Sequence, residues 1–245
     1  WAAYHNDVTM VRKLLTSGAS VKITNRYGLS ALWAACLNGS ESVVNMLLKA
    51  GADPNTKRDG GETVLMTASR TGKLAAVKSL IQAGAAVNAE EQRGQTALMW
   101  AAAEGHVSVV DALLEAKAKF REPLKSGFTP LSFAARNGHL EVAKRLLHAG
   151  VNVNRAMQEA KGGRNKPTRN TSPLMLALEN GHFELAAFLL DAGANPNDDR
   201  TGFAPLHALS WIRKPEKGDG ANGTPPPRGS GDLTSLDIVR KLVAH

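Results

Sequence analysis

The sequence predicts an all-α protein, a solenoid of about seven stacked helix–turn–helix repeats with projecting hairpin loops and two loop insertions. Three observations lead to this fold class. The sequence repeats itself every 33 residues, each repeat holds two short segments with helical apolar spacing, and hydrophobic residues make up 43% of the chain while aromatic residues make up 5%. Small apolar side chains favour helices that pack closely on each other and disfavour a β-sandwich.

A single leucine position marks seven repeats along the chain. It is occupied by Leu14, Leu47, Leu80, Leu113, Leu146, Leu189 and Leu242. The first four separations are 33 residues, the fifth is 43 and the sixth is 53, so two repeats carry ten and twenty additional residues. The repeats run approximately over 1–27, which is partial, then 28–60, 61–93, 94–126, 127–169, 170–201 and 202–245. We expect one continuous domain over residues 1–245.

The fifth repeat shows how each element is encoded. Thr129 is a suitable N-cap and Pro130 fits the first helical position, so a first helix is expected to begin there and to stop near Gly138. A second helix with one apolar stripe follows and ends at Gly150, where a left-handed cap costs little. Two helices this short cannot bury their apolar faces alone, so each repeat must pack on its neighbours.

The additional residues form two insertions at different places in the repeat. The first, roughly 155–170, enlarges the hairpin between the fifth and sixth repeats. The second runs from near Arg213 to Leu233, is rich in glycine and proline, and precedes an apolar stripe at 236–243 that matches the second helix at 140–147. We therefore predict an interruption inside the seventh repeat rather than a linker between domains, since a long loop adds only modest closure entropy.

Several short motifs recur at fixed places in the repeats. They are TPL at 129–131, APLH at 204–207, Gly-His at 105–106, 138–139 and 181–182, GADPN at 51–55 and GANPN at 193–197. With these motifs the chain resembles the ankyrin-repeat family over essentially its whole length. The resemblance implies stacked helix–turn–helix repeats, hairpins that project to one side, histidines that pack the turns, and a concave surface that binds proteins.

Two departures from the family pattern lead to expectations of their own. Only His207 keeps the histidine that the family places in the first helix, which affects hydrogen bonding there and not the fold. Lys117 stands where other repeats have a helix-ending glycine such as Gly84, and a side chain in a left-handed conformation costs about 1 kcal/mol. We therefore expect the repeat that contains Lys117 to end differently.

The two ends of the chain lack the polar capping repeats with which solenoids normally finish. The chain opens at Trp1 inside a repeat and stops at His245, one residue before the next expected glycine. We expect a fragment of a longer repeat array.

No catalytic or metal-binding pattern stands out from the repeat background. The only cysteine, Cys36, aligns with Ala102 and Ala135 and is expected to be a small packing residue. The histidines lack metal-site spacing, and neither a nucleophile motif nor a carboxylate pair is evident. We expect no enzyme activity, metal or cofactor in these residues. The apolar runs are also shorter than the ~20 residues needed to span a membrane.

Binding is expected where the repeats differ while their core positions stay constant. By resemblance to the family, these places are the hairpin tips and the ends of the first helices. The candidate partner-binding residues are Arg26, Tyr27, Leu29, Leu37, Asn38, Arg70, Thr71, Gln92, Arg93, Gln95, Glu104, Lys125, Phe128, Arg136, Asn137, Arg200, Phe203 and Trp211. Aromatic residues interleaved with arginines are enriched at protein-binding hot spots. Phe128 and Phe203 fit equally well a second role, in which they brace adjacent hairpins.

These observations predict a non-enzymatic protein–protein interaction scaffold that holds a partner on its hairpin and inner-helix face. The formal net charge of +8 favours an acidic partner. One alternative is a nucleic-acid or polyanion binder that uses the basic insertion 155–170, which the scattered charge and the lack of a nucleic-acid motif disfavour. Another alternative is the regulatory repeat array of a larger enzyme.

Overall fold

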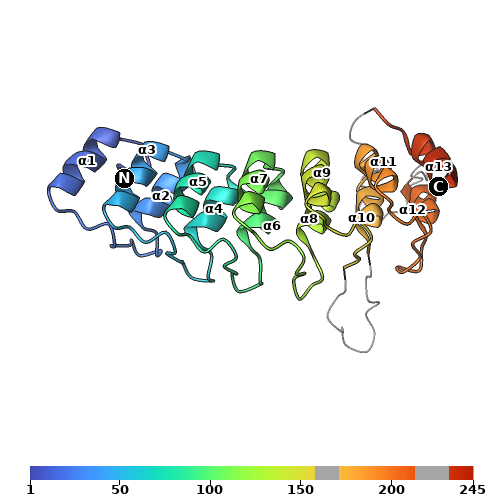
Figure 1. The fold of residues 1–245 in the computed structure, drawn as a ribbon, viewed down its shortest axis with the longest axis horizontal. Helices are drawn as coiled ribbons and strands as arrows, with labels where there is room; N and C mark the ends of the chain where they lie inside the picture. The colour runs from blue at the N-terminus through green and yellow to red at the C-terminus, as the bar shows by residue number, and fades with distance from the viewer. Residues whose placement is uncertain (158–170, 213–231, 245) are drawn as a thin grey trace, which may run out of the picture. The chain divides into compact units, whose positions relative to one another are not determined.

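The computed structural model describes residues 1–157, 171–212 and 232–244, with the backbone alone at 211–212. The chain divides into two compact units, an N-terminal unit over residues 1–119 and a C-terminal unit over residues 120–245. Figure 1 shows the helices of each unit. The described ranges contain thirteen helices and, in place of strands, the isolated β-bridges Thr24–Ser30 and Lys57–Thr63. The prediction of an all-α repeat solenoid is confirmed, whereas a single domain over 1–245 stays a prediction.

The N-terminal unit consists of two layers of helices. Its helices are α1 (Val8–Thr16), α2 (Ala31–Asn38), α3 (Glu41–Lys49), α4 (Val64–Arg70), α5 (Leu74–Gln82), α6 (Ala97–Glu104) and α7 (Val107–Glu115). The first helices of successive repeats, α2, α4 and α6, pack on each other as an inner layer, and α1, α3, α5 and α7 form the outer layer. The loops between repeats project from one side of this unit (Figure 1).

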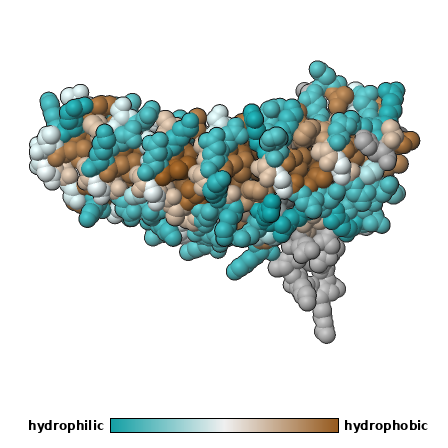
Figure 2. Space-filling view, viewed as in Figure 1, coloured by the Kyte–Doolittle hydropathy of each residue, from teal (hydrophilic) through white to brown (hydrophobic). Residues whose placement is uncertain are grey.

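The C-terminal unit repeats the same two-layer arrangement. Its helices are α8 (Pro130–Asn137), α9 (Leu140–His148), α10 (Pro173–Glu179), α11 (Phe183–Asp191), α12 (Pro205–Ile212) and α13 (Ser235–Ala244). Helix α10 packs between α8 and α12 in the inner layer, and α11 packs between α9 and α13 in the outer layer. In the view of Figure 2, hydrophobic residues gather along the band of helices, and hydrophilic residues gather along the loops.

Hydroxyl side chains begin most of the first helices. The Oγ atom of the cap residue accepts a hydrogen bond from the backbone N–H three residues later at Ser30, Thr63, Thr96, Thr129 and Ser172. The predicted cap at Thr129 is thus confirmed, with Pro130 in the first turn and Gly138 left-handed at φ 78°. In the seventh repeat Ala204 has no hydroxyl, and its N–H donates to Nδ1 of His207 at 3.3 Å instead. A different pair of atoms therefore closes the same helical turn.

The leucine position that recurs in each repeat lies in the core in six of the seven repeats. Leu80, Leu113, Leu146 and Leu189 are 0% exposed, Leu47 is 3% exposed and Leu242 is 9% exposed. Leu14 is 46% exposed because α1 packs on α3 along one side only. Cys36 is fully buried, as expected of a packing residue, and burial raises the pKa of its thiol to about 12.

The end of the fourth repeat corrects one expectation. Lys117 adopts the left-handed conformation, with φ 64°, although it carries a side chain. Its N–H donates to the carbonyl of Leu114 at 3.0 Å, and the N–H of Ala118 donates to that of Leu113 at 2.9 Å. Gly84 has φ 87° and makes the corresponding bond to Ile81 at 3.0 Å. The expectation that this repeat ends differently is therefore wrong, because the turn bonds hold Lys117 in the glycine conformation.

The two helices of the seventh repeat pack as a pair despite the insertion between them. Helices α12 and α13 contact each other, and Nζ of Lys241 on α13 lies 2.6 Å from a carboxylate oxygen of Asp191 on α11. This pairing supports an interruption within one repeat, and the interruption itself stays a prediction. Residues 213–231 of that insertion lie outside the described residues.

The hairpin between the fifth and sixth repeats is closed at its root by one backbone hydrogen bond. The N–H of Met157 donates to the carbonyl of Thr171 at 3.0 Å. Residues 158–170 lie outside the described residues, and so does most of the basic segment 155–170 to which the polyanion-binding alternative was assigned.

Candidate functional site

The residues predicted to bind a partner lie on the surface of both units, with none of the described ones fully buried. Exposed are Arg26, Tyr27, Asn38, Gln92, Arg93, Glu104, Lys125, Arg136, Asn137, Arg200 and Phe203. Half-buried are Leu29, Leu37, Arg70, Thr71, Gln95 and Phe128. The remaining candidate, Trp211, lies in α12, and its side chain is outside the described residues.

The first hairpin presents an arginine and a tyrosine together. The carboxamide oxygen of Asn25 accepts hydrogen bonds from the N–H groups of Tyr27 at 2.9 Å and Leu29 at 3.0 Å, which fixes the tip. The guanidinium of Arg26 lies 4.9 Å from the centre of the Tyr27 ring. Tyr27 is still 62% exposed, so the pair offers a cation and an aromatic face to solvent.

Leu29 and Leu37 line a hollow in the N-terminal unit. Its volume is ≈ 480 Å³, and its wall also includes Trp1, Tyr4 and Leu14. Most of the lining side chains are apolar. The lining comes mainly from the first residues of the chain, from α1 and α2 and from the hairpin between them.

The second hairpin and the end of α4 bring two arginines to one carboxylate. Glu62 lies 3.4 Å from Nη2 of Arg70 and 3.5 Å from Nη1 of Arg58, with a different carboxylate oxygen facing each. The hydroxyl of Thr67 donates to the oxygen that faces Arg70, at 2.9 Å. We call Arg58, Glu62 and Arg70 the Glu62 cluster. Two cations share one anion there, which leaves a net charge of about +1.

Neighbouring repeats hold the Glu62 cluster in place. The N–H of Arg58 donates to the carbonyl of Glu62 at 3.0 Å across the hairpin. The next hairpin is bonded to this one, because the N–H of Gln92 donates to the carbonyl of Gly60 at 2.9 Å. The hairpin is thus tied both internally and to its neighbour, so the charged side chains start from an ordered backbone.

Two tryptophans lie under the arginines of the Glu62 cluster. The guanidinium of Arg70 is 5.3 Å from the ring centre of Trp100, and that of Arg58 is 5.9 Å from that of Trp33. Trp33 is 1% exposed, whereas Trp100 is half-buried. The Nε1 atom of Trp100 is one of two buried side-chain polar atoms without a hydrogen-bond partner among the described residues. Such an atom is normally paired, and leaving it unpaired costs about 1–3 kcal/mol.

His106 fixes the end of α4, from which Arg70 extends. Its Nε2 atom lies 2.9 Å from the carbonyl oxygen of Arg70. In the C-terminal unit, Nε2 of His182 lies 3.1 Å from the carbonyl oxygen of Arg136. The family resemblance implied turn-packing roles for these histidines, and both contacts confirm it. Burial lowers the pKa of His182, the charge of nearby His139 lowers it further, and the Arg136 carbonyl partly opposes them.

The C-terminal unit carries a related arginine–aromatic group. Phe128 and Phe133 of the fifth repeat stack with ring centres 4.9 Å apart, and the guanidinium of Arg136 is 5.8 Å from the centre of Phe128. Arg136 and Phe128 occupy the same repeat positions as Arg70 and Glu62. Phe128 is therefore supported from within its own repeat, by Phe133, and it remains half-buried.

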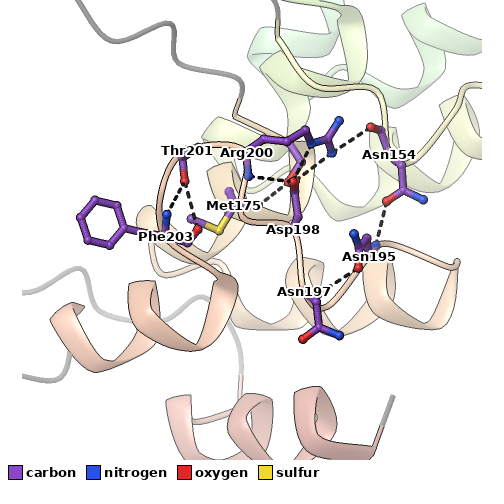
Figure 3. A network of polar contacts seen from close by, with 9 residues as sticks. Asn154, Met175, Asn195, Asn197, Asp198, Arg200, Thr201 and Phe203 are labelled. Carbon is purple, nitrogen blue, oxygen red and sulfur yellow. Dashed lines mark hydrogen bonds and ion pairs between the residues drawn. The ribbon is translucent and has the colours of Figure 1, made fainter.

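Arg200 is engaged with a buried carboxylate, as Figure 3 shows. Its Nε donates to Asp198 at 2.6 Å, its Nη2 donates to the second oxygen at 2.8 Å, and Nη2 also donates to the carbonyl of Asn154 at 3.2 Å. Asp198 is 3% exposed. Burial would raise the pKa of Asp198, but hydrogen bonds from Arg200 and Ser172 and the Arg200 charge hold it below its ordinary value. Arg200 therefore ties two hairpins together, while nearby Phe203 is 60% exposed.

Arg58, Glu62 and Trp100 are not among the candidate residues predicted from the sequence. Glu62 occupies the same repeat position as Leu29, Gln95, Phe128 and Phe203, all of which were selected, so the repeat alignment could have identified it. Trp100 falls in an inner helix whose neighbouring residues are core. Its contact with Arg70 arises only when α4 and α6 are stacked, so no signal within one repeat indicates it.

The described residues show no arrangement typical of a metal centre, since no group of three or more His, Cys, Asp or Glu side chains is placed to hold an ion. Within the same residues, no helix has the length and apolar character needed to cross a membrane.

Comparisons with known proteins agree with this architecture. The family model for ankyrin repeats in three copies matches residues 1–91 and 65–157, and the model for a single ankyrin repeat matches residues 169–200. No curated protein matches the chain. Among solved structures, the ankyrin repeat domain of human ASB11 is 24% identical, with a TM-score of 0.73. That match covers 84% of this chain and 89% of the other. The family models cover most of the chain, and the protein belongs to the ankyrin-repeat family.

Proposed function

We propose that this chain binds a partner protein, without catalysis, through the hairpin tips and the ends of its first helices. Ankyrin repeats are in general protein–protein interaction modules, and their fold is typically non-enzymatic. One observation carries the choice of surface: in both units, the arginine at the end of a first helix lies over an aromatic ring. These are Arg70 over Trp100, at 5.3 Å, and Arg136 over Phe128, at 5.8 Å.

The charge on this surface supports an acidic partner. Arg26 and Arg93 are exposed at hairpin tips of the N-terminal unit, and Arg70 adds a third cation at the end of α4. Arginine beside an aromatic ring combines a charge, several donors and an apolar face, which is the composition of interface hot spots. An acidic segment that also carries aromatic or apolar side chains would use both the arginines and the exposed ring of Tyr27.

A charge-reversal experiment tests the proposed surface. Peptides that bind the chain are first selected from a displayed random library, and their affinities are measured by fluorescence anisotropy. The double variant Arg26→Glu and Arg93→Glu should bind roughly tenfold more weakly, since two favourable charge contacts become repulsive. The matched control is Lys49→Glu and Lys78→Glu, which makes the same charge change on exposed positions of the outer helices α3 and α5. Equal losses in the two double variants would contradict the assignment of the surface.

A further inference from the structure

We propose that the Glu62 cluster is a carboxylate-binding site for an acidic side chain of a partner, and that Glu62 holds this site in the free chain. The inference rests on the proposed function and assigns chemistry to one part of the surface. Two arginines, one from the second hairpin and one from the end of α4, converge on a single carboxylate.

The ion pairs within the cluster are loose. The N–O distances of 3.4 and 3.5 Å are longer than the 2.7–2.9 Å, approximately, of strong charge-assisted hydrogen bonds. The side chains of Arg70 and Arg58 are 37% and 43% exposed, so solvent screens both pairs. Among the described residues, Glu62 is the one carboxylate within ion-pair distance of either arginine. Most N–H donors of both guanidinium groups therefore remain available to a ligand.

Glu62 itself is the more firmly held member of the cluster. It is 17% exposed, and it accepts the Thr67 hydroxyl at 2.9 Å while its backbone closes the hairpin. A partner carboxylate would therefore approach the arginines from solvent and leave Glu62 bonded to Thr67. A bound carboxylate would supply a second negative charge, so that the two guanidinium groups of the cluster would be balanced by two carboxylates.

Trp100 supports Arg70 from below. The Arg70 guanidinium lies over the ring of Trp100, 5.3 Å from its centre, and Trp100 itself is half-buried in the inner layer. The indole Nε1 has no acceptor among the described residues. The Nε1 atom is buried, so it is not a contact for a ligand from solvent. What favours an acidic ligand is the one positive charge of the cluster that Glu62 leaves unbalanced.

The local charge favours a carboxylate over a nucleic-acid backbone. A nucleic-acid strand needs several cations, one for each phosphate that it presents. The cluster has two arginines and already contains an anion between them, which leaves about one positive charge. The two arginines are already arranged around a carboxylate in the free chain, because Glu62 directs one oxygen to each of them.

The substitution Glu62→Gln separates this inference from a purely structural role for Glu62. The amide is of similar shape and keeps an oxygen that can accept the Thr67 hydroxyl, but it removes the charge that competes for Arg58 and Arg70. The probe is a fluorescein-labelled hexaglutamate peptide, measured by fluorescence anisotropy at low salt. Glu62→Gln should bind this peptide roughly threefold to tenfold more tightly than the unmodified chain, because a local repulsion is removed.

Variants of the two arginines complete the test. Arg70→Gln and, independently, Arg58→Gln should each weaken binding about threefold or more, and combining either with Glu62→Gln should abolish the gain. Lys49→Gln with Lys78→Gln is the control for net charge and should change the affinity by less than about twofold. Thermal unfolding of each variant verifies that it is folded. A hexaglutamine peptide should not bind.

Three results would overturn the inference. They are an unchanged affinity in folded Glu62→Gln, a loss in the lysine control as large as in the arginine variants, and tighter binding of a thymidylate hexamer than of hexaglutamate. Failure of the proposed function has a different signature. In that case the library-selected peptides are insensitive to Arg26→Glu and Arg93→Glu, whatever the response of hexaglutamate to Glu62→Gln.

Discussion

The imidazole ring of His106 lies so close to Gly72 that a Cβ atom on Gly72 would stand 2.7 Å from it. The same ring bonds the carbonyl oxygen of Arg70 at 2.9 Å. One histidine therefore packs the turn that follows α4 and fixes the helix end from which a cluster arginine extends. Stability of the repeat stack and geometry of the candidate site are connected at this residue.

The first prediction concerns this close approach. Gly72→Ala should lower the free energy of unfolding by about 2 kcal/mol or more, because it combines a left-handed backbone at φ 71° with a clash against His106. Gly84→Ala is the matched control, since Gly84 has φ 87° but nothing within 4 Å of the added Cβ, and it should cost about 1 kcal/mol. Urea unfolding measures both. Equal losses would show that the histidine gives way at no cost.

The second prediction concerns the left-handed lysine at the end of the fourth repeat. Lys117→Gly should raise the free energy of unfolding by about 1 kcal/mol, because glycine adopts φ 64° without strain. Ser108→Gly, at an exposed helical position of α7, should instead lower it by about 0.5 kcal/mol. Urea unfolding measures both variants. A gain in the free energy of unfolding for Lys117→Gly and a loss for Ser108→Gly would show that the backbone conformation at each position, and not the flexibility of glycine alone, decides the change in stability. A loss at Lys117 would contradict it.

The third prediction uses the buried carboxylate of Asp198. Because its folded-state pKa lies below the ordinary value of 3.8, its stabilising contribution is fully present above about pH 3.8 and is lost as pH falls through the folded-state pKa. Asp198→Asn should lower the free energy of unfolding by about 2 kcal/mol at neutral pH, and this difference should shrink in acid. The exposed neighbour provides the control: Asp199→Asn should cost less than about 0.5 kcal/mol. Urea unfolding at a series of pH values measures the effect.

The fourth prediction concerns His182 at mildly acidic pH. Since the folded state lowers its pKa below 6.5, the unfolded chain takes up a proton first as pH falls. The free energy of unfolding should therefore decrease below about pH 6.5 and level off below the folded-state pKa. His182→Gln should remove this part of the pH dependence. A slope that is identical in the variant would refute the assignment to His182.

Local features of the fold could be predicted because their causes lie within one repeat. The start of α8 could be predicted because the Thr129 hydroxyl caps the helix and Pro130 fits its first turn. The repeated leucine position predicts which side chains are buried in the core. Lys117 shows the limit of this reasoning. Its intrinsic preference opposes a left-handed turn, but the two hydrogen bonds formed there outweigh it.

The candidate site was harder to predict because its contacts join different parts of the repeat stack. Arg58 and Glu62 meet through a hairpin, and Arg70 joins them from the end of the following helix. The Trp100 ring comes from the next repeat altogether. A surface location for Arg70 could be predicted from its place at the end of a first helix. The residues that it contacts depend on how successive repeats stack on each other.

The pairing of α12 with α13 has a consequence for counting repeats in genomes. The family matches end at residue 200, yet both helices occupy their regular layers, with α12 against α10 and α13 against α11. Repeats of this kind are therefore better counted from paired helices than from unbroken sequence motifs.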